Sequence, residues 1–213
     1  DNAMGVAALL EIAEAMDKMP VKPLRSVIFL LTTGEEKGLL GSSYYTGHPV
    51  KPLYKTIANV NIDGIAYFEQ FRSIVGIGAD YSTLEHNLLN VAAKMGIKPD
   101  KIPQESIQGE SFAYSDQYSF ARAGVPSVLI YEGSEYHHSS YKKGLERLIN
   151  YSLNVYHTPF DDMNQQINYE AAEEHINLIY NFCLDLANDM MEPEWNYNSP
   201  FLNERLRTKA ERR

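Results

Sequence analysis

The apolar run from Val27 to Leu31 is followed directly by Thr32-Thr33-Gly34-Glu35-Glu36. Residues 25–32 are too apolar for a strand with one solvated face, so they predict a strand covered on both faces, as in α/β sheets. Two adjacent carboxylates at the end of such a strand repel each other, and a low dielectric constant raises that cost. A bound cation would offset the repulsion, with one Glu as its ligand and the other free as a base. A solvated pair that opens a loop is the alternative.

Helices and strands alternate along the rest of the chain. Periodicity and stop signals predict helices at 3–18, 39–45, 83–95, 115–123, 142–151 and 169–190, and further strands at 57–62, 73–78 and 127–131. This alternation predicts an α/β fold, a three-layer sandwich with a mixed, mostly parallel central sheet and helices on both faces. Residues 1–191 are expected to form one domain, and residues 192–213 a C-terminal tail. Residues 98–111 carry no periodicity and predict a long loop.

Composition limits the classes of partner. The formal net charge of −9 argues against nucleic acid, because phosphate binding requires basic patches. No apolar run approaches the roughly 20 residues that a membrane-spanning helix needs. Cys183 is the only cysteine, which excludes an internal disulfide and a thiolate zinc cluster. Any bound metal must therefore use histidine and carboxylate ligands.

Four potential ligands stand at the ends of predicted elements. Glu36 and Asp63 each follow a strand, Asp1 precedes the first helix, and His157 lies in the loop before the last long helix. Sites in open α/β sheets form at the carboxyl ends of strands, so these side chains are expected to cluster. Carboxylate and imidazole ligands suit zinc, with manganese or cobalt as alternatives.

Several spaced motifs carry a resemblance to a known family. They are Asp1-Asn2-Ala3-Met4-Gly5-Val6-Ala7, Thr33-Gly34-Glu35-Glu36-Lys37-Gly38-Leu39-Leu40-Gly41-Ser42, Asn61-Ile62-Asp63-Gly64, Ser115-Asp116-Gln117 and Tyr156-His157-Thr158-Pro159. In this order, residues 1–157 resemble the zinc-dependent aminopeptidases with two co-catalytic metals. That group includes bacterial leucyl aminopeptidases, glutamate carboxypeptidase relatives and glutaminyl cyclases. The resemblance implies a zinc-exopeptidase-like fold.

The resemblance also implies a set of metal ligands. By position, Asp1 would bridge two zinc ions, Glu36 and His157 would complete one site, and Asp63 would belong to the other. The family has a further histidine ligand in a His-x-Asp motif, and this sequence begins at the Asp. The site that holds Asp63 would then have two protein ligands, too few for tight zinc binding. We therefore expect two zinc ions per intact domain but at most one firmly held by this N-terminally truncated chain, which could account for an inactive isolated chain.

The implied activity is hydrolysis of N-terminal peptide bonds in a peptide or aminoacyl substrate. Glu35 would act as general base and acid toward the attacking water, and Tyr156 resembles a residue that in some relatives donates to the substrate carbonyl oxygen. The specificity pocket is expected to involve residues 98–111 and 132–141. Most relatives act outside the cytoplasm and a lone cysteine is compatible with export, which favours a periplasmic or secreted protein.

Two alternatives keep the same fold. A glutaminyl cyclase-like acyltransferase with one zinc would use Asp1, Glu36 and His157, and would tolerate the absence of the upstream histidine. A non-catalytic domain would keep the peptidase fold for binding, as transferrin-receptor-like ectodomains do. Such domains usually lose metal ligands, whereas four potential ligands are present here.

Overall fold

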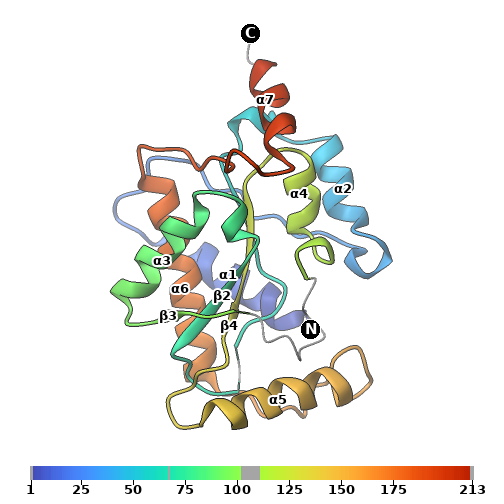
Figure 1. Cartoon of the computed structure of the whole chain (residues 1–213), viewed down its shortest axis with the longest axis vertical. Helices are drawn as coiled ribbons and strands as arrows, with labels where there is room; N and C mark the ends of the chain where they lie inside the picture. Colours follow the sequence, from blue (N-terminus) through green and yellow to red (C-terminus); the bar gives the residue numbers. More distant parts are fainter. Residues whose placement is uncertain (1, 67, 102–110, 212–213) are drawn as a thin grey trace.

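The computed structural model describes residues 2–66, 68–101 and 111–211. Its centre is a mixed sheet with the strand order β1-β4-β2-β3, flanked by helices (Figure 1). The strands are β1 (Asn59–Asn61), β2 (Ser73–Ile77), β3 (Lys98–Pro99) and β4 (Ser127–Glu132). The predicted strands at 57–62, 73–78 and 127–131 are thus confirmed, with shifted ends.

The strand directions place the carboxyl ends of β1 and β4 at the same end of the sheet. β1 and β4 are parallel, with Val60 opposite Val128, whereas β2 is antiparallel to β4, with Val75 opposite Tyr131. β3 is parallel to β2. The mixed α/β fold is therefore confirmed, and the segments that follow β1 and β4 leave the sheet on the same side.

Seven α-helices are described. They are α1 (Ala3–Asp17), α2 (Leu40–Gly47), α3 (Leu84–Lys94), α4 (Gln117–Arg122), α5 (Tyr141–Asn154), α6 (Tyr169–Asn188) and α7 (Leu202–Ala210). Each helix predicted from the sequence is present, and α7 was not predicted. None of the described helices combines the length and apolar character needed to cross a bilayer.

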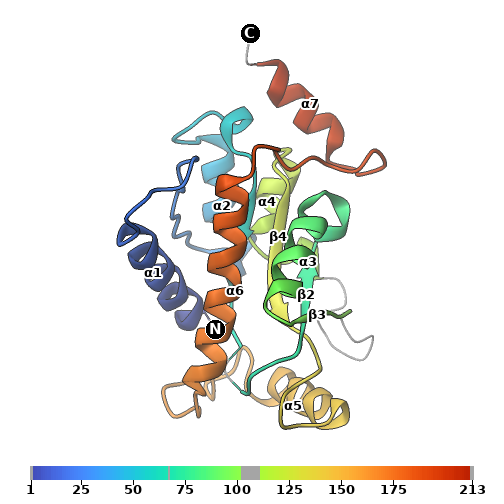
Figure 2. The same cartoon turned by 90° about the vertical axis from the view of Figure 1, so that its left-hand side faces the viewer.

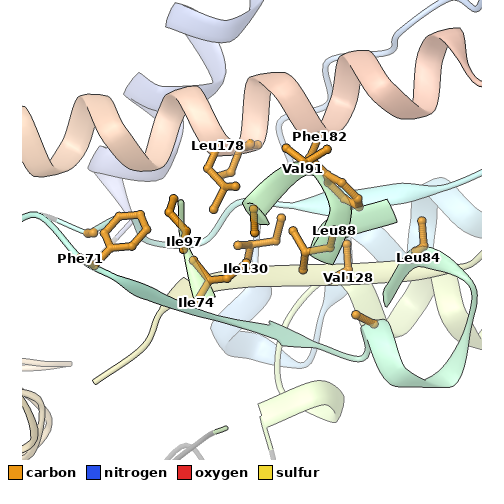
Figure 3. Packing of buried hydrophobic residues seen from close by; sticks show 14 of the residues in the cluster. Phe71, Ile74, Leu84, Leu88, Val91, Ile97, Val128, Ile130, Leu178 and Phe182 are labelled. Atoms are coloured by element: carbon orange, nitrogen blue, oxygen red, sulfur yellow. The ribbon is translucent and has the colours of Figure 1, made fainter. Parts of the chain in front are cut away.

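The main core lies between the sheet, α3 and α6 (Figure 3). Ile74, Val128 and Ile130 project from one face of the sheet and pack with Leu178 and Phe182 of α6. The opposite face carries Val75, Ile77 and Leu129, as the period-two alternation of a strand requires. α6 also lies beside α1 (Figure 2), and residues of α1, α3 and α6 pack together in the core on this face of the sheet.

The predicted strand at 25–32 is wrong in this structure. These residues form no regular element, and the backbone groups of residues 26–32 make no hydrogen bond to any described residue. Ile28 and Leu31 are 46% and 60% exposed. The physical reason is that a strand needs a neighbouring strand to satisfy its backbone groups, and no described strand lies alongside. The apolar side chains of this run would suit a buried strand, but the described residues do not cover them.

The C-terminal tail packs on the domain at the end opposite α5 (Figures 1 and 2). Trp195 is 5% exposed, and its indole N–H donates to the carbonyl oxygen of Gly124 at 2.9 Å. Arg205 of α7 is 3% exposed and donates to the carbonyl oxygens of Leu53 and Thr56. The tail is thus anchored by buried groups, while its separation at residue 191 stays a prediction.

Candidate active site

The Glu-Glu pair lies on a single turn of 3-10 helix, Glu35–Lys37. The turn is flanked by Gly34 and Gly38, whose φ angles of 69° and 97° are ones that glycine adopts without strain. Leu39 follows with φ 58°, which is strained for a branched side chain. This local chemistry holds the two carboxylates at a sharp turn rather than along a strand.

Glu36 is brought to the predicted metal ligand His157. Its Oε1 lies 2.5 Å from Nε2 of His157, and both side chains are partly exposed. His157 has φ 56°, a left-handed conformation that is uncommon for residues other than glycine and that often marks functional sites. The ring of Tyr156 stacks on that of His157 with centroids 3.7 Å apart. The predicted site residues Glu36, His157 and Tyr156 are therefore in contact with one another through His157.

Glu35 lies in a strongly acidic environment. Burial and, to a lesser extent, the charges of Asp63, Glu36 and Asp116 together raise the pKa of Glu35 to about 7. A general base is most effective when its pKa is close to the working pH. The carboxylate that the resemblance assigns as base is therefore the one whose pKa is shifted toward neutrality.

Asp63 is held just beyond the end of β1. A Cβ atom on Gly5 would lie 2.3 Å from the carbonyl oxygen of Asp63, so the glycine lets α1 approach this backbone closely. The hydroxyl of Ser115 donates to Oδ2 of Asp63 at 2.8 Å, and the Asn61 side-chain amide donates to Ser115 at 3.0 Å. Ser115 thus orients the predicted ligand, a role that sequence reasoning missed.

Asp116 is a further acidic residue of the site. The hydroxyl of Thr32 donates to its Oδ2 at 2.5 Å, which ties the segment before the Glu-Glu turn to the start of α4. Asp116 also contributes to the raised pKa of Glu35. The signal available in the sequence was the polar triplet Ser115-Asp116-Gln117 directly before a helix.

Tyr156 retains its proton over the physiological pH range. Burial and, to a lesser extent, the nearby charges of Asp63, Glu36 and Glu35 together raise its pKa to about 12. The hydroxyl therefore remains a hydrogen-bond donor. This is the protonation state that donation to a substrate carbonyl oxygen requires.

The donor types fit zinc, although the described ligands are few. Glu36 and His157 provide one carboxylate and one imidazole, both common zinc ligands. Asp1, the predicted bridging ligand, lies outside the described residues. Among the residues that are described, no three histidine, cysteine or acidic side chains form a group able to hold a metal ion.

A cavity of about 300 Å³ opens beside this cluster. Gly64, next to Asp63, and Tyr156, next to His157, border it. Much of its wall is apolar, with Val75 and Ile77 from β2 and Leu148 from α5. Glu132 and Gly133 fall in the segment predicted to shape the pocket, whereas α5 and residues 161–167 were missed. Residues 102–110 of the predicted loop lie outside the described residues.

Comparison with known families agrees with this geometry. The model of the family described as Peptidase family M28 matches residues 1–183. The chain belongs to peptidase family M28. The match includes every predicted site residue of this M28 chain.

Curated relatives carry peptidase names. The chain is 31% identical over 142 residues to leupeptin-inactivating enzyme 1 of Streptomyces exfoliatus, covering 64% of this chain and 29% of that protein. It is 28% identical over 219 residues to probable leucine aminopeptidase 2 of Aspergillus oryzae, covering 98% of this chain and 42% of that protein. The M28 chain thus spans less than half the length of these two relatives.

Solved structures share the fold. An aminopeptidase from Aneurinibacillus sp. strain AM-1 superposes with a TM-score of 0.64 at 20% identity, covering 88% of this chain and 39% of that one. A peptidase M28 precursor from Shewanella amazonensis SB2B gives a TM-score of 0.60 at 24% identity, covering 90% of this chain and 38% of that one. At these identities the likeness shows the fold.

Proposed function

We propose that this M28 chain is the catalytic part of a zinc-dependent aminopeptidase that removes N-terminal residues from peptides. The observation that carries the proposal is the position of Glu35 directly before the Glu36 that contacts His157. A base and a pair of metal-type ligands side by side are the parts that metal-assisted peptide hydrolysis requires.

Each residue has a defined task in this mechanism. Glu36, His157 and Asp63, together with the expected ligand Asp1, would hold zinc, which would supply a Lewis acid. Glu35 accepts a proton from the attacking water and later delivers it to the leaving amine. The Tyr156 hydroxyl donates to the oxygen that becomes negative on the scissile carbonyl.

The cavity beside Tyr156 completes the proposal. It is large enough for one amino-acid side chain, and its border with Gly64 and Tyr156 joins it to the acidic cluster. A substrate whose reacting carbonyl lies at the cluster would place its first side chain in the cavity. Such a pocket supports an exopeptidase that reads the N-terminal residue.

The test compares two reactions in the zinc-loaded chain. We expect hydrolysis of aminoacyl nitroanilides and no cyclisation of peptides with N-terminal glutamine; cyclisation alone would instead identify the glutaminyl cyclase-like acyltransferase. Glu35→Gln is expected to lower kcat by at least about 100-fold, the usual contribution of a general base, with zinc content unchanged. Neither reaction would be catalysed by a non-catalytic binding domain.

A matched variant controls for the loss of one carboxylate. Glu173→Gln makes the same chemical change on the exposed face of α6 and should leave both activity and zinc content unchanged. If Glu35→Gln instead lost its zinc and Glu36→Gln kept it, the roles assigned to the two carboxylates would be reversed.

A further inference from the structure

Helix α5 supplies one wall of the cavity through Leu148, Tyr151 and Ser152. The second and third of these lie three and four positions after the first, so all three share one face of the helix. The helix lies across one end of the molecule (Figure 1), and no other described helix or strand packs extensively against it. Gly144 is the only buried residue in the described helix. The position of this wall therefore depends on a small number of contacts.

An ion pair joins the middle of α5 to the segment between β1 and β2. Nη1 of Arg147 donates to Oε2 of Glu69 at 2.8 Å. Glu69 is 8% exposed, and its carboxylate also accepts hydrogen bonds from the backbone amide of His138 at 2.6 Å and the hydroxyl of Ser139 at 2.7 Å. Removing one partner of a buried ion pair costs far more than removing one partner of an exposed pair. This pair is therefore a strong link between α5 and the rest of the domain.

Both partners of this ion pair are adjacent in sequence to residues that border the cavity, namely Phe68 before Glu69 and Leu148 after Arg147. The ring of Phe68 also meets the ring of Tyr151 edge-on, with centroids 5.7 Å apart. A gap of about 1 Å forfeits up to half of the dispersion attraction between atoms in contact. A small shift of α5 would therefore weaken the packing of the cavity wall against a side chain that fills the cavity.

We propose that Glu69 and Arg147 are positioning residues, which hold α5 in place as a wall of the cavity and so set the affinity for the first side chain of the substrate. This inference rests on the proposed aminopeptidase function, which places that side chain in the cavity. Neither residue borders the cavity, so both act through Leu148 and Tyr151. A long apolar side chain reaches from the β2 wall to α5, whereas a methyl group does not. Only the long side chain therefore depends on where α5 lies.

The test uses two ligands that differ only in the side chain. L-leucinol and L-alaninol carry the same amine and alcohol groups and have no bond that a peptidase could cleave. Isothermal titration calorimetry of the zinc-loaded chain should show tighter binding of leucinol. In Arg147→Gln the ratio of the two dissociation constants should fall by about tenfold, because the longer side chain loses its contact with α5. A general loss of stability would weaken the binding of both ligands alike and leave this ratio unchanged.

Two further variants complete the comparison. Ser139→Ala removes one donor to Glu69 and should lower the preference for leucinol by a smaller factor, so the test does not depend on the folding of Arg147→Gln. Lys142→Gln is the matched control, because it removes a cation from the same helix. The Lys142 side chain is 86% exposed and pairs with Glu146 at 3.9 Å, outside the cavity. This variant should keep the wild-type preference.

Three results would overturn the inference. The first is a wild-type chain without a preference for leucinol, and the second is an equal loss of preference in Lys142→Gln. The third is an unchanged preference in folded Arg147→Gln or, if that variant does not fold, in Ser139→Ala. Hydrolysis of aminoacyl nitroanilides is scored separately. A chain whose preference for leucinol depends on Arg147 but which cleaves nothing would refute the peptidase proposal alone.

Discussion

The carboxylate of Glu36 lies 2.5 Å from Nε2 of His157, and a non-glycine residue with a left-handed backbone conformation occurs in the motif of each. His157 itself has φ 56°, and Leu39, three residues after Glu36, has φ 58°. These are the two non-glycine residues with positive φ in the part of the chain that the structure describes. Backbone strain persists where surrounding structure over-determines it, and it clusters at functional sites. The strain therefore marks the same two motifs that the metal-ligand assignment uses.

The first prediction concerns metal content. His157→Ala should reduce zinc retained after dialysis from at most about one per chain to near zero, because one ligand of the Glu36–His157 pair is lost. Elemental analysis measures this directly. His48→Ala, which removes an exposed histidine outside the site, should retain the wild-type amount. Two fully occupied zinc ions in the wild-type chain would contradict the expectation of one firm site.

The second prediction concerns the orientation of Asp63. Ser115→Ala removes the hydroxyl that donates to Oδ2 of Asp63. Loss of such a supporting hydrogen bond typically costs about 10–100-fold in metal affinity or activity, so we expect kcat/KM to fall by that factor with the fold intact. Nitroanilide kinetics and circular dichroism check both parts. Ser43→Ala, at an exposed serine, should change neither, and an unaffected Ser115→Ala would remove Ser115 from the site.

The third prediction concerns Glu69, which is 8% exposed and ties α5 to the preceding loop. Burial alone would raise its pKa, but hydrogen bonds from Ser139, Arg147 and the His138 amide lower it to about 2. Since the unfolded value is 4.5, this stabilisation is present above pH 4.5 and is lost as the pH falls through 2. Glu69→Gln should cost about 3 kcal/mol at pH 7.

Urea unfolding at pH 7 and pH 3 measures that difference. The gap between wild type and Glu69→Gln should shrink at pH 3, where the wild-type carboxylate has already lost part of its advantage. Glu135→Gln removes an exposed carboxylate 3.9 Å from Lys98 and should cost less than about 1 kcal/mol. A gap that is independent of pH would show that the ionised carboxylate is not the stabilising group.

The fourth prediction concerns His175, which is fully buried on α6. Its Nδ1 accepts a hydrogen bond from the Ala66 amide, and burial lowers its pKa from 6.5 to about 4. Stability is therefore complete above pH 6.5 and falls as the pH drops toward 4, because the unfolded chain binds the proton first. The loss should reach about 3 kcal/mol.

Equilibrium unfolding between pH 7 and pH 4 tests this. His175→Gln should be less stable at pH 7 but should lack this part of the slope, since it has no group to protonate. His86→Gln, at an exposed position on α3, should keep the wild-type slope. Equal slopes in wild type and His175→Gln would refute the assignment.

The fifth prediction concerns the tail. Trp195→Ala should destabilise the fold by about 3–5 kcal/mol, because it empties a buried site and leaves the Gly124 carbonyl without its donor. Thermal unfolding measures the change. Tyr197→Ala is the control, since Tyr197 is 95% exposed and should alter stability by less than about 0.5 kcal/mol. A small effect of Trp195→Ala would mean that the tail is not part of the folding unit.

Much of the fold could be predicted because the signals are local. The apolar periodicity of α6 and the short apolar strands β2 and β4 each define an element without reference to the rest of the chain. The prediction of a strand at residues 25–32 was wrong because an apolar segment forms a strand only where a neighbouring strand pairs with it. The segment's own sequence does not show whether such a strand is present. Helix α7 was missed because its sequence is mostly charged and polar, and its anchor, Arg205, is a residue type that is seldom buried.

The sequence by itself determined the types of chemical group at the site and their order along the chain. Glu35, Glu36, Asp63 and His157 could be named because each stands at the end of an element, where their chemistry is recognisable. Only the tertiary structure decided which groups touch. It placed Glu36 against His157, Ser115 against Asp63, and a largely apolar cavity beside them. The physical reason is that distances, burial and pKa shifts arise between segments that are far apart in sequence, and only packing brings those segments together.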